Sequence, residues 1–363
     1  MKRFYLAGLL LWATCSTPLI TVAVGQRVVS GTSSPNRSAD TTRLLFARDS
    51  ALRLTLTANL RVLLKDRGET PVNHPVVLTY ADDRQQSVTL PLAVKVRGNF
   101  RRSSVNCSFP PLLLDFPKKK THHTLFEDQN KLKLVTHCQT DEYVVREYLV
   151  YKLFNLLTDR SFQARLARVT YVDSLGKRAP ETHLAFLLED ENAVAKRNGA
   201  TLYKRKQTNV RYVDTLGMAT VAVFEYLIGN TDWSVPFLHN IRLLALSTGS
   251  TPFPVPYDFD HAGIVEADYA RPAEQLGIQS VRERMYRGMA YPAAVFQTVF
   301  DRFNELKPQL YAVYTNESRL SPAYVRRTLK YLDDFYRIIN KPALVRSEFR
   351  LGDQSHIVIK GLH

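Results

Sequence analysis

Apolar residues follow two patterns along this chain. Up to about residue 190 they mostly alternate with polar residues or form compact runs, which is typical of β-strands. Beyond that point they recur mainly at helical spacing. Strands are predicted at residues 52–56, 76–78, 88–96, 112–114, 132–134, 166–172 and 183–188, helices at 141–157, 216–228, 294–314 and 321–340, and a short β pair at 241–246 and 253–257. The expected fold class is α+β, with a β-rich N-terminal lobe that holds one helix and a mainly helical C-terminal lobe.

Changes in local composition divide the rest of the chain. Residues 26–45 are rich in Ser, Thr, Asn and Gly and are expected to form a flexible lead-in. The last strand of the N-terminal lobe ends in Glu189-Asp190, where apolar residues give way to charged ones at the expected hinge. We therefore assign the N-terminal lobe to 46–190, the helical lobe to 191–345 and a C-terminal tail to 346–363.

Residues 1–25 have the pattern of a secretory signal peptide. Lys2 and Arg3 precede a long apolar stretch, and Ala23-Val24-Gly25 offers a cleavage site with small residues. An uncleaved N-terminal anchor is the alternative, because the apolar stretch is long. No later segment has enough consecutive apolar residues to span a membrane, so we expect no span after signal removal. The expected location is periplasmic or extracellular.

The composition is that of a globular protein with a basic surface. Of 363 residues, 45% are hydrophobic, which excludes a disordered or fibrous chain. The 49 basic and 34 acidic residues give a net charge of +15, which favours anionic ligands such as phosphates. The basic residues are dispersed, however, and the longest run is only 118–120, so nucleic-acid binding is not expected.

Cys107 and Cys138 remain once residues 1–25 are removed, and an even pair in an oxidising compartment favours a disulfide. Two buried free thiols are the alternative. The chain has no P-loop, no Gly-x-Gly-x-x-Gly, no His-Glu-x-x-His and no Gly-x-Ser-x-Gly motif. It also has no Cys-x-x-Cys, so a structural zinc site is not expected. His122 and His123 are interpreted as a solvated surface pair.

Two segments carry carboxylates where strands and helices end. Asp232 follows the apolar helix 216–228, and Asn240 comes just before the next strand. Asp258 and Asp260 follow the next β run, two residues apart. Carboxylate and amide oxygens are the ligands that Mg²⁺ prefers, and a separate Asp can accept the proton of an attacking hydroxyl. This pattern predicts a metal–phosphate site, with turn-capping roles for Asp232 and Asp258 as the alternative.

These residues resemble the CotH (spore coat protein H)-like kinases, which have an atypical protein-kinase-like fold, over roughly residues 50–345. Residues 94–102 read Val-Lys-Val-Arg-Gly-Asn-Phe-Arg-Arg and are similar to the Arg-Gly-x-x-x-Arg signature of that family. Residues 130–134, Asn-Lys-Leu-Lys-Leu, lead into the helix 141–157. The Asn-x-Asp, Asn and Asp-x-Asp series that begins at Asn230 is also similar to HipA-type kinases. The resemblance implies a bilobal kinase that binds ATP with Mg²⁺ or Mn²⁺ and phosphorylates a protein acceptor of unknown identity.

The resemblance also implies roles for individual residues. Asp232 is the expected base or hydroxyl-orienting group. Asn240 and Asp258 are the expected metal ligands, and Asp260 is expected to be a second metal-binding carboxylate or a carboxylate that supports the ligands. Lys133 is the chosen phosphate lysine, held by Glu147, although Lys95 and Lys131 stay open as alternatives. Arg97 and Gly98 are expected to border the phosphates, and Glu189 to lie at the adenine-side hinge.

Two departures from the kinase pattern keep other functions open. Asp232 and Asn240 are eight residues apart, three more than in ordinary protein kinases, and 109–111 read Phe-Pro-Pro where the family usually has a Lys. The first alternative is therefore a catalytically inactive kinase-fold module that binds partners at the cell surface. The second is a metal-dependent phosphohydrolase that uses Asp258, Asp260, His239 and His261.

Overall fold

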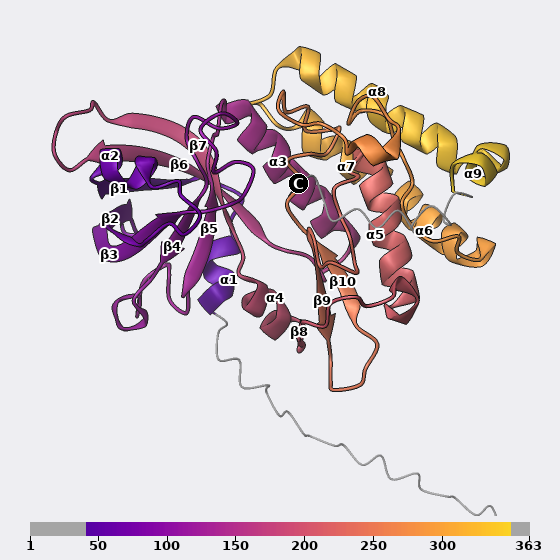
Figure 1. The fold of residues 1–363 in the computed structure, drawn as a ribbon, viewed down its shortest axis with the longest axis horizontal. Coiled ribbons are helices and arrows are strands. Elements are labelled where there is room, and N and C mark those ends of the chain that lie inside the picture. The colour runs from indigo at the N-terminus through magenta and orange to yellow at the C-terminus, as the bar shows by residue number, and fades with distance from the viewer. Residues whose placement is uncertain (1–40, 350–363) are drawn as a thin grey trace, which may run out of the picture. The chain divides into compact units, whose positions relative to one another are not determined.

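The computed structural model describes residues 41–349. The predicted signal peptide and most of the predicted tail lie outside the described residues. Within them, strands dominate up to residue 188 and helices dominate afterwards, so the predicted α+β class is confirmed (Figure 1). The boundary between lobes at residue 190 stays a prediction.

Seven strands form a closed barrel in the order β1-β2-β3-β4-β5-β7-β6. Neighbouring strands are antiparallel, except that β1 pairs with β6 in parallel, from Leu52 opposite Ala167 to Ala58 opposite Asp173. This pairing closes the barrel between segments far apart in the sequence, and the apolar pattern did not predict it. The strands are β1 (Leu52–Ala58), β2 (His74–Ala81), β3 (Ser87–Val96), β4 (Leu112–Asp115), β5 (Lys131–Val135), β6 (Ala164–Asp173) and β7 (Glu181–Leu188).

The alternating residues of these strands fill the barrel. Leu54, Val94 and Leu132 are buried in one hydrophobic cluster, and the intervening polar side chains face outward. Every strand predicted from the alternation is present, with bounds that differ by a few residues.

Helices and a small second sheet make up the rest of the described residues. The helices are α1 (Thr41–Phe46), α2 (Leu60–Lys65), α3 (Asp141–Leu157), α4 (Glu191–Arg197), α5 (Thr215–Ile228), α6 (Ala293–Glu305), α7 (Lys307–Thr315), α8 (Pro322–Ile339) and α9 (Pro342–Glu348). The sheet has the order β10-β9-β8, with β8 (Thr201–Tyr203), β9 (Ile241–Ala245) and β10 (Phe253–Pro256). None of the helices within 41–349 is both long and apolar enough to cross a membrane.

Local signals explain most helix ends. The side chains of Thr140 and Ser321 accept hydrogen bonds from the first turns of α3 and α8, as N-caps do. Gly229 ends α5 in the left-handed region, with φ of 68°. The single helix predicted over 294–314 is divided into α6 and α7 around Leu306, because Pro308 lacks the N–H that would continue the ladder. The predicted lead-in also ends early, since α1 begins at Thr41.

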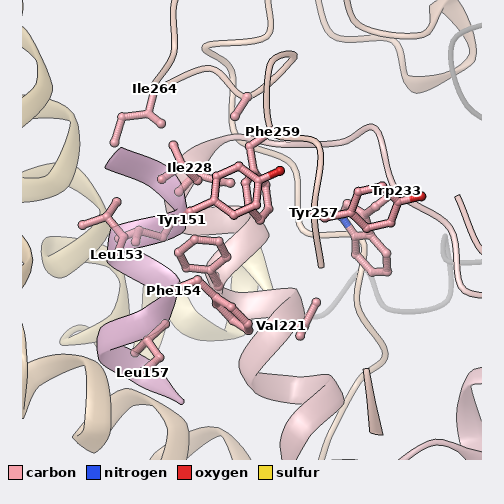
Figure 2. Packing of buried hydrophobic residues seen from close by; sticks show 14 of the residues in the cluster. Tyr151, Leu153, Phe154, Leu157, Val221, Ile228, Trp233, Tyr257, Phe259 and Ile264 are labelled. Carbon is pink, nitrogen blue, oxygen red and sulfur yellow. The ribbon is translucent and has the colours of Figure 1, made fainter. Parts of the chain in front are cut away.

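Aromatic packing between α3 and α5 holds the segment that follows β10. Phe154 of α3 lies 4.7 Å from Phe224 of α5, and Tyr151 lies 4.8 Å from Phe259, measured between ring centroids (Figure 2). Phe259 is fully buried between two carboxylate residues. Its burial therefore fixes Asp258 and Asp260 against the helix α3.

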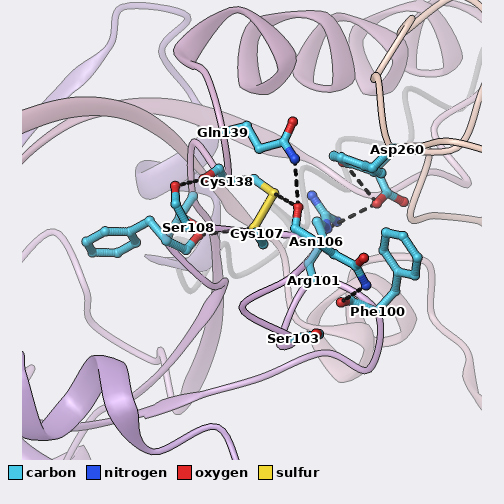
Figure 3. Close-up of a disulfide and its surroundings, with 12 residues drawn as sticks. Phe100, Arg101, Ser103, Asn106, Cys107, Ser108, Cys138, Gln139 and Asp260 are labelled. Atoms are coloured by element: carbon cyan, nitrogen blue, oxygen red, sulfur yellow. Dashed lines mark hydrogen bonds and ion pairs between the residues drawn. A yellow bond between two sulfur atoms is a disulfide. The ribbon is translucent and has the colours of Figure 1, made fainter.

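The disulfide predicted between Cys107 and Cys138 is confirmed. It connects the loop after β3 to the turn before α3, and it is surrounded by hydrogen bonds (Figure 3). Gln139 Nε2 donates to the Asn106 carbonyl at 2.9 Å, and Asn106 Nδ2 donates to the Phe100 carbonyl at 3.0 Å. The loop that carries Arg101 is thereby held at both ends.

We expect the Cys107→Ala/Cys138→Ala double variant to lose about 3–4 kcal/mol of unfolding free energy, because the disulfide closes a loop of 31 residues and limits the unfolded chain. Urea denaturation without reductant would measure the loss. Dithiothreitol should destabilise the native protein by a similar amount and leave the double variant unaffected. Equal stability of the two proteins would contradict the prediction.

Candidate active site

Asp232 and Asn240 come together although eight residues separate them. Asn240 Nδ2 donates to the Asp232 carbonyl at 2.8 Å and to Asp232 Oδ2 at 3.0 Å. The intervening residues fold back in a small turn that is closed by a bridge between Ser234 and His239. The three extra residues are therefore accommodated within the loop.

His239 fixes the charge of Asp232. Its Nε2 lies 2.9 Å from Asp232 Oδ1. Burial by itself would raise the pKa of Asp232, but the hydrogen bond and charge of His239 lower that pKa below its ordinary value. Asp232 is consequently ionised at neutral pH and suited to accept a hydrogen bond from a hydroxyl group.

Three non-glycine residues near this loop adopt left-handed backbone conformations. Leu238 has φ of 52°, Asn240 has φ of 51° and Asp258 has φ of 64°. Such conformations are costly for residues with a Cβ, above all for Leu, and they concentrate at functional sites. The Asp258 N–H donates to the Tyr151 hydroxyl at 2.9 Å, which helps to hold this conformation.

The guanidinium of Arg101 binds three carboxylates at once. Its Nη1 lies 2.9 Å from Glu147 Oε2 and its Nη2 lies 2.9 Å from Asp258 Oδ1. Its Nε lies 3.1 Å from Asp260 Oδ2 (Figure 3). Only 8% of the Arg101 side chain is exposed. Asp260 Oδ2 also accepts a hydrogen bond from the Tyr269 hydroxyl. Arg101 thus joins the loop after β3, the helix α3 and the segment after β10.

Sequence reasoning missed Arg101 as a site residue and assigned Glu147 to the wrong partner. Glu147 was expected to hold Lys133, whereas its contact is with Arg101. Burial raises the pKa of Glu147, although the charge of Arg101 opposes this shift. By contrast, burial would raise the pKa of Asp258, but Arg101 and Arg97 lower it. Arg101 directly precedes the last arginine of the Arg-Gly-x-x-x-Arg signature, and this position was the only available signal.

A second group of cations surrounds Tyr257. Lys133 Nζ lies 4.7 Å and the Arg242 guanidinium 4.5 Å from the centroid of its ring. Arg242 also pairs with Glu191. Burial, followed by the nearby charge of Arg97, lowers the pKa of Lys133 to about 8. An anionic ligand would therefore favour the protonated, positively charged form of Lys133.

Arg101 with its two aspartates and Tyr257 with its neighbouring cations line one cavity of about 510 Å³, a volume typical of small-molecule sites. Among the predicted site residues it is lined by Arg97, Gly98, Lys133, Asp232, Asn240, Asp258 and Asp260. Lys131 also lines it, whereas Lys95 does not. The structure thus brings together most of the residues chosen from the sequence.

Glu147 and Glu189 lie outside the lining of this cavity. Glu147 supports it through Arg101. Glu189 is buried and accepts from Arg197 at 2.9 Å and from the Gln163 N–H at 2.9 Å, so its side chain joins β7 to neighbouring segments. The next two residues, Asp190 and Glu191, do line the cavity.

Replacement of Arg101 by Met should cost about 3–5 kcal/mol of unfolding free energy at pH 7.5, because it leaves buried carboxylates without their cation. Their pKa values would then rise, so acidification to pH 5 should protonate them and reduce the deficit relative to the native protein. Urea denaturation at both pH values would measure this. The matched control is Arg102→Met, because Arg102 is only partly buried and donates to the Glu69 carbonyl and not to a carboxylate. If the variant loses the same unfolding free energy at both pH values, the unpaired charge of the carboxylates is not the cause of the loss.

Comparisons with known proteins add little to this geometry. No protein-family model matches the chain, and neither does any curated protein sequence. One solved structure that is similar to it is described as the crystal structure of a Helicobacter pylori proinflammatory kinase, CtkA. The two are 12% identical with a TM-score of 0.35, over 76% of this chain and 92% of that one.

Proposed function

We propose that this protein is a kinase of the CotH-like type, with a β-rich and a helical lobe, that transfers the γ-phosphoryl group of ATP to a hydroxyl group of a protein. The observation that carries the proposal is the convergence of Asp232, Asn240, Asp258 and Lys133 on one cavity, although they come from three separate segments. The signal-like pattern of residues 1–25 supports a periplasmic or extracellular location. A closed barrel is not the usual form of a kinase N-terminal lobe, so the proposal rests on the site and not on the fold.

The donor atoms fit a hard divalent cation at one end of the cavity. Because the Asn240 amide nitrogen donates twice to Asp232, its Oδ1 is left for another partner. Asp258 uses Oδ1 for Arg101, and a third of its side chain is exposed. Asn240 and Asp258 would therefore hold Mg²⁺ or Mn²⁺, which neutralises phosphate oxygens when bound. Asp260, which is engaged by Arg101 and Tyr269, would act as a supporting carboxylate.

Basic side chains along the rest of the cavity favour a polyphosphate ligand. Lys133, Arg97 and Arg242 line the cavity, and burial followed by the charge of Arg97 lowers the pKa of Lys133. Gly98, with φ of 90°, would allow the backbone to approach a phosphate closely.

In the proposed reaction the acceptor oxygen attacks the γ-phosphorus, the bond to ADP breaks, and the acceptor proton leaves through Asp232. The contribution of this chain is to position the reactants and stabilise charge. Asp232 is itself positioned by His239 and Asn240, so its carboxylate needs no rearrangement to orient the hydroxyl.

One observation favours the inactive binding module as a second candidate. The Arg101 guanidinium already neutralises Asp258 and Asp260, which would otherwise attract a metal ion. With Arg101 in this position, the cavity could bind an anionic ligand without transferring a phosphoryl group. Metal-dependent nucleotide binding distinguishes the two functions.

ATP with Mg²⁺ or Mn²⁺ should raise the unfolding temperature of the purified protein. At about 100 times its Kd the nucleotide would stabilise the fold by about 2.7 kcal/mol. The shift should require the metal and should disappear in Asp258→Ala. Asp301→Ala is the matched control, because Asp301 is exposed on α6 and does not line the cavity.

Three other results would each contradict the kinase proposal. A shift with ATP alone, unchanged by metal, would support the binding module. Release of free phosphate from ATP without any phosphorylated product would support the phosphohydrolase. An unfolding temperature that no nucleotide or metal changes would show that the protein has no nucleotide site.

Nucleotide affinity should be constant near pH 7 and fall as the pH rises through about 8. Lys133 has a pKa of about 8, and a bound phosphate would raise that pKa, so binding above pH 8 must take up a proton. Isothermal titration in buffers of different ionisation enthalpy would measure the proton uptake. Lys133→Met should abolish it, whereas Lys131→Met should keep it, because Lys131 is half exposed and pairs with Asp115. Uptake lost only in Lys131→Met would assign the phosphate to Lys131.

A further inference from the structure

A second cluster of metal-ligating side chains lies outside the lining of the cavity described above. His137 belongs to the turn after β5, Asp141 is the first residue of α3, and His183 belongs to β7. One ligand atom from each residue lies within 4.8 Å of the other two. His183 Nδ1 is 3.1 Å from Asp141 Oδ1. Two segments that are distant in the sequence, 137–141 and β7, therefore bring two imidazoles and a carboxylate close together.

Unpartnered buried atoms are a second, independent sign of a ligand here. His137 is 7% exposed, and its Nδ1 has no hydrogen-bond partner within the described residues. The Tyr171 hydroxyl is likewise buried without a partner, and it feels the charge of Asp141. Buried polar atoms are nearly always satisfied, and leaving one unpaired costs about 1–3 kcal/mol. The His137 Nδ1 atom is therefore available to a bound ion, and the Tyr171 hydroxyl is available to a neighbouring ligand.

The ligand types decide which ion fits. Imidazole nitrogen suits borderline ions such as Zn²⁺, whereas Mg²⁺ and Ca²⁺ prefer oxygen ligands only. Two histidines with one carboxylate form a common three-residue zinc set, with a fourth position left for water. The Tyr171 hydroxyl, next to Asp141, would hydrogen-bond to a ligand or to that water.

One adjustment is needed, and the exposed side of the cluster allows it. The rings of His137 and His183 are stacked, with centroids 3.8 Å apart and planes at 15°. Since imidazole lone pairs lie in the ring plane, one ring must rotate before both nitrogens can face a single ion. The His183 side chain is 32% exposed and can rotate, whereas His137 is fixed among Phe109, Tyr171 and His183.

We propose that His137, Asp141 and His183 form a binding site for one divalent transition-metal ion of the zinc class. The bound ion would join β7 to the start of α3. Its ligand His137 directly precedes the disulfide cysteine Cys138. The ion would therefore stabilise the N-terminal end of the helix that presents Glu147 to Arg101.

The test is titration of the metal-stripped, untagged full chain with ZnCl₂, followed by calorimetry and thermal unfolding. We expect one Zn²⁺ per chain and a higher unfolding temperature, with binding about tenfold or more weaker in His183→Ala and in Asp141→Asn. His122→Ala is the control, because His122 is an exposed histidine outside the cluster. CoCl₂ provides a second measurement on the native protein, since its visible spectrum reports nitrogen ligation without any variant.

Two results would overturn the proposal. The first is the absence of Zn²⁺ binding and of a Co²⁺ spectrum in the native protein. The second is binding that His183→Ala leaves intact and His239→Ala removes, which would assign the ion to the Asp232 cavity.

Discussion

The buried guanidinium of Arg101 is the interaction on which the site depends. It compensates carboxylates from α3 and from the segment after β10, and none of these groups is stable in the interior without it. The disulfide also ties the loop that carries Arg101 to the start of α3. A displacement of either segment would therefore change the distances between Arg101 and its carboxylates. The aromatic packing of Phe259 between Asp258 and Asp260 holds the other side of this network.

The balance of charge within the cavity limits what it can bind. Arg101 pairs with Asp258 and Asp260, while Lys133, Arg97 and Arg242 also line the cavity. A ligand that supplies both a cation and several negative charges, as a metal–nucleotide complex does, would match both the carboxylates and the basic side chains. An anion alone would match only the basic side chains. This difference in charge is what separates a phosphotransferase from a binding module here.

The start of α3 collects several constraints that act on the same helix. The disulfide ends at Cys138, the candidate metal ligands flank it at His137 and Asp141, and the N-cap is Thr140. Two turns further along, Glu147 contacts Arg101. Since a helix transmits displacement along its axis with little bending, stabilisation of its first turn also fixes the position of Glu147.

The local elements and most of the residues that line the cavity could be predicted from the sequence alone. Alternation and helical spacing identified the barrel strands, α3, α5 and α8, because these patterns record which side of each element is buried. The chemistry of Asp232, Asn240, Asp258 and Asp260 could be predicted because these oxygen-bearing side chains are close together in the chain and are of the type that binds Mg²⁺. The closure of the barrel, the partner of Glu147, the role of Arg101 and the meeting of His137 with His183 required the three-dimensional structure. These depend on contacts between residues far apart in the chain, which leave no periodic signal in the sequence around them.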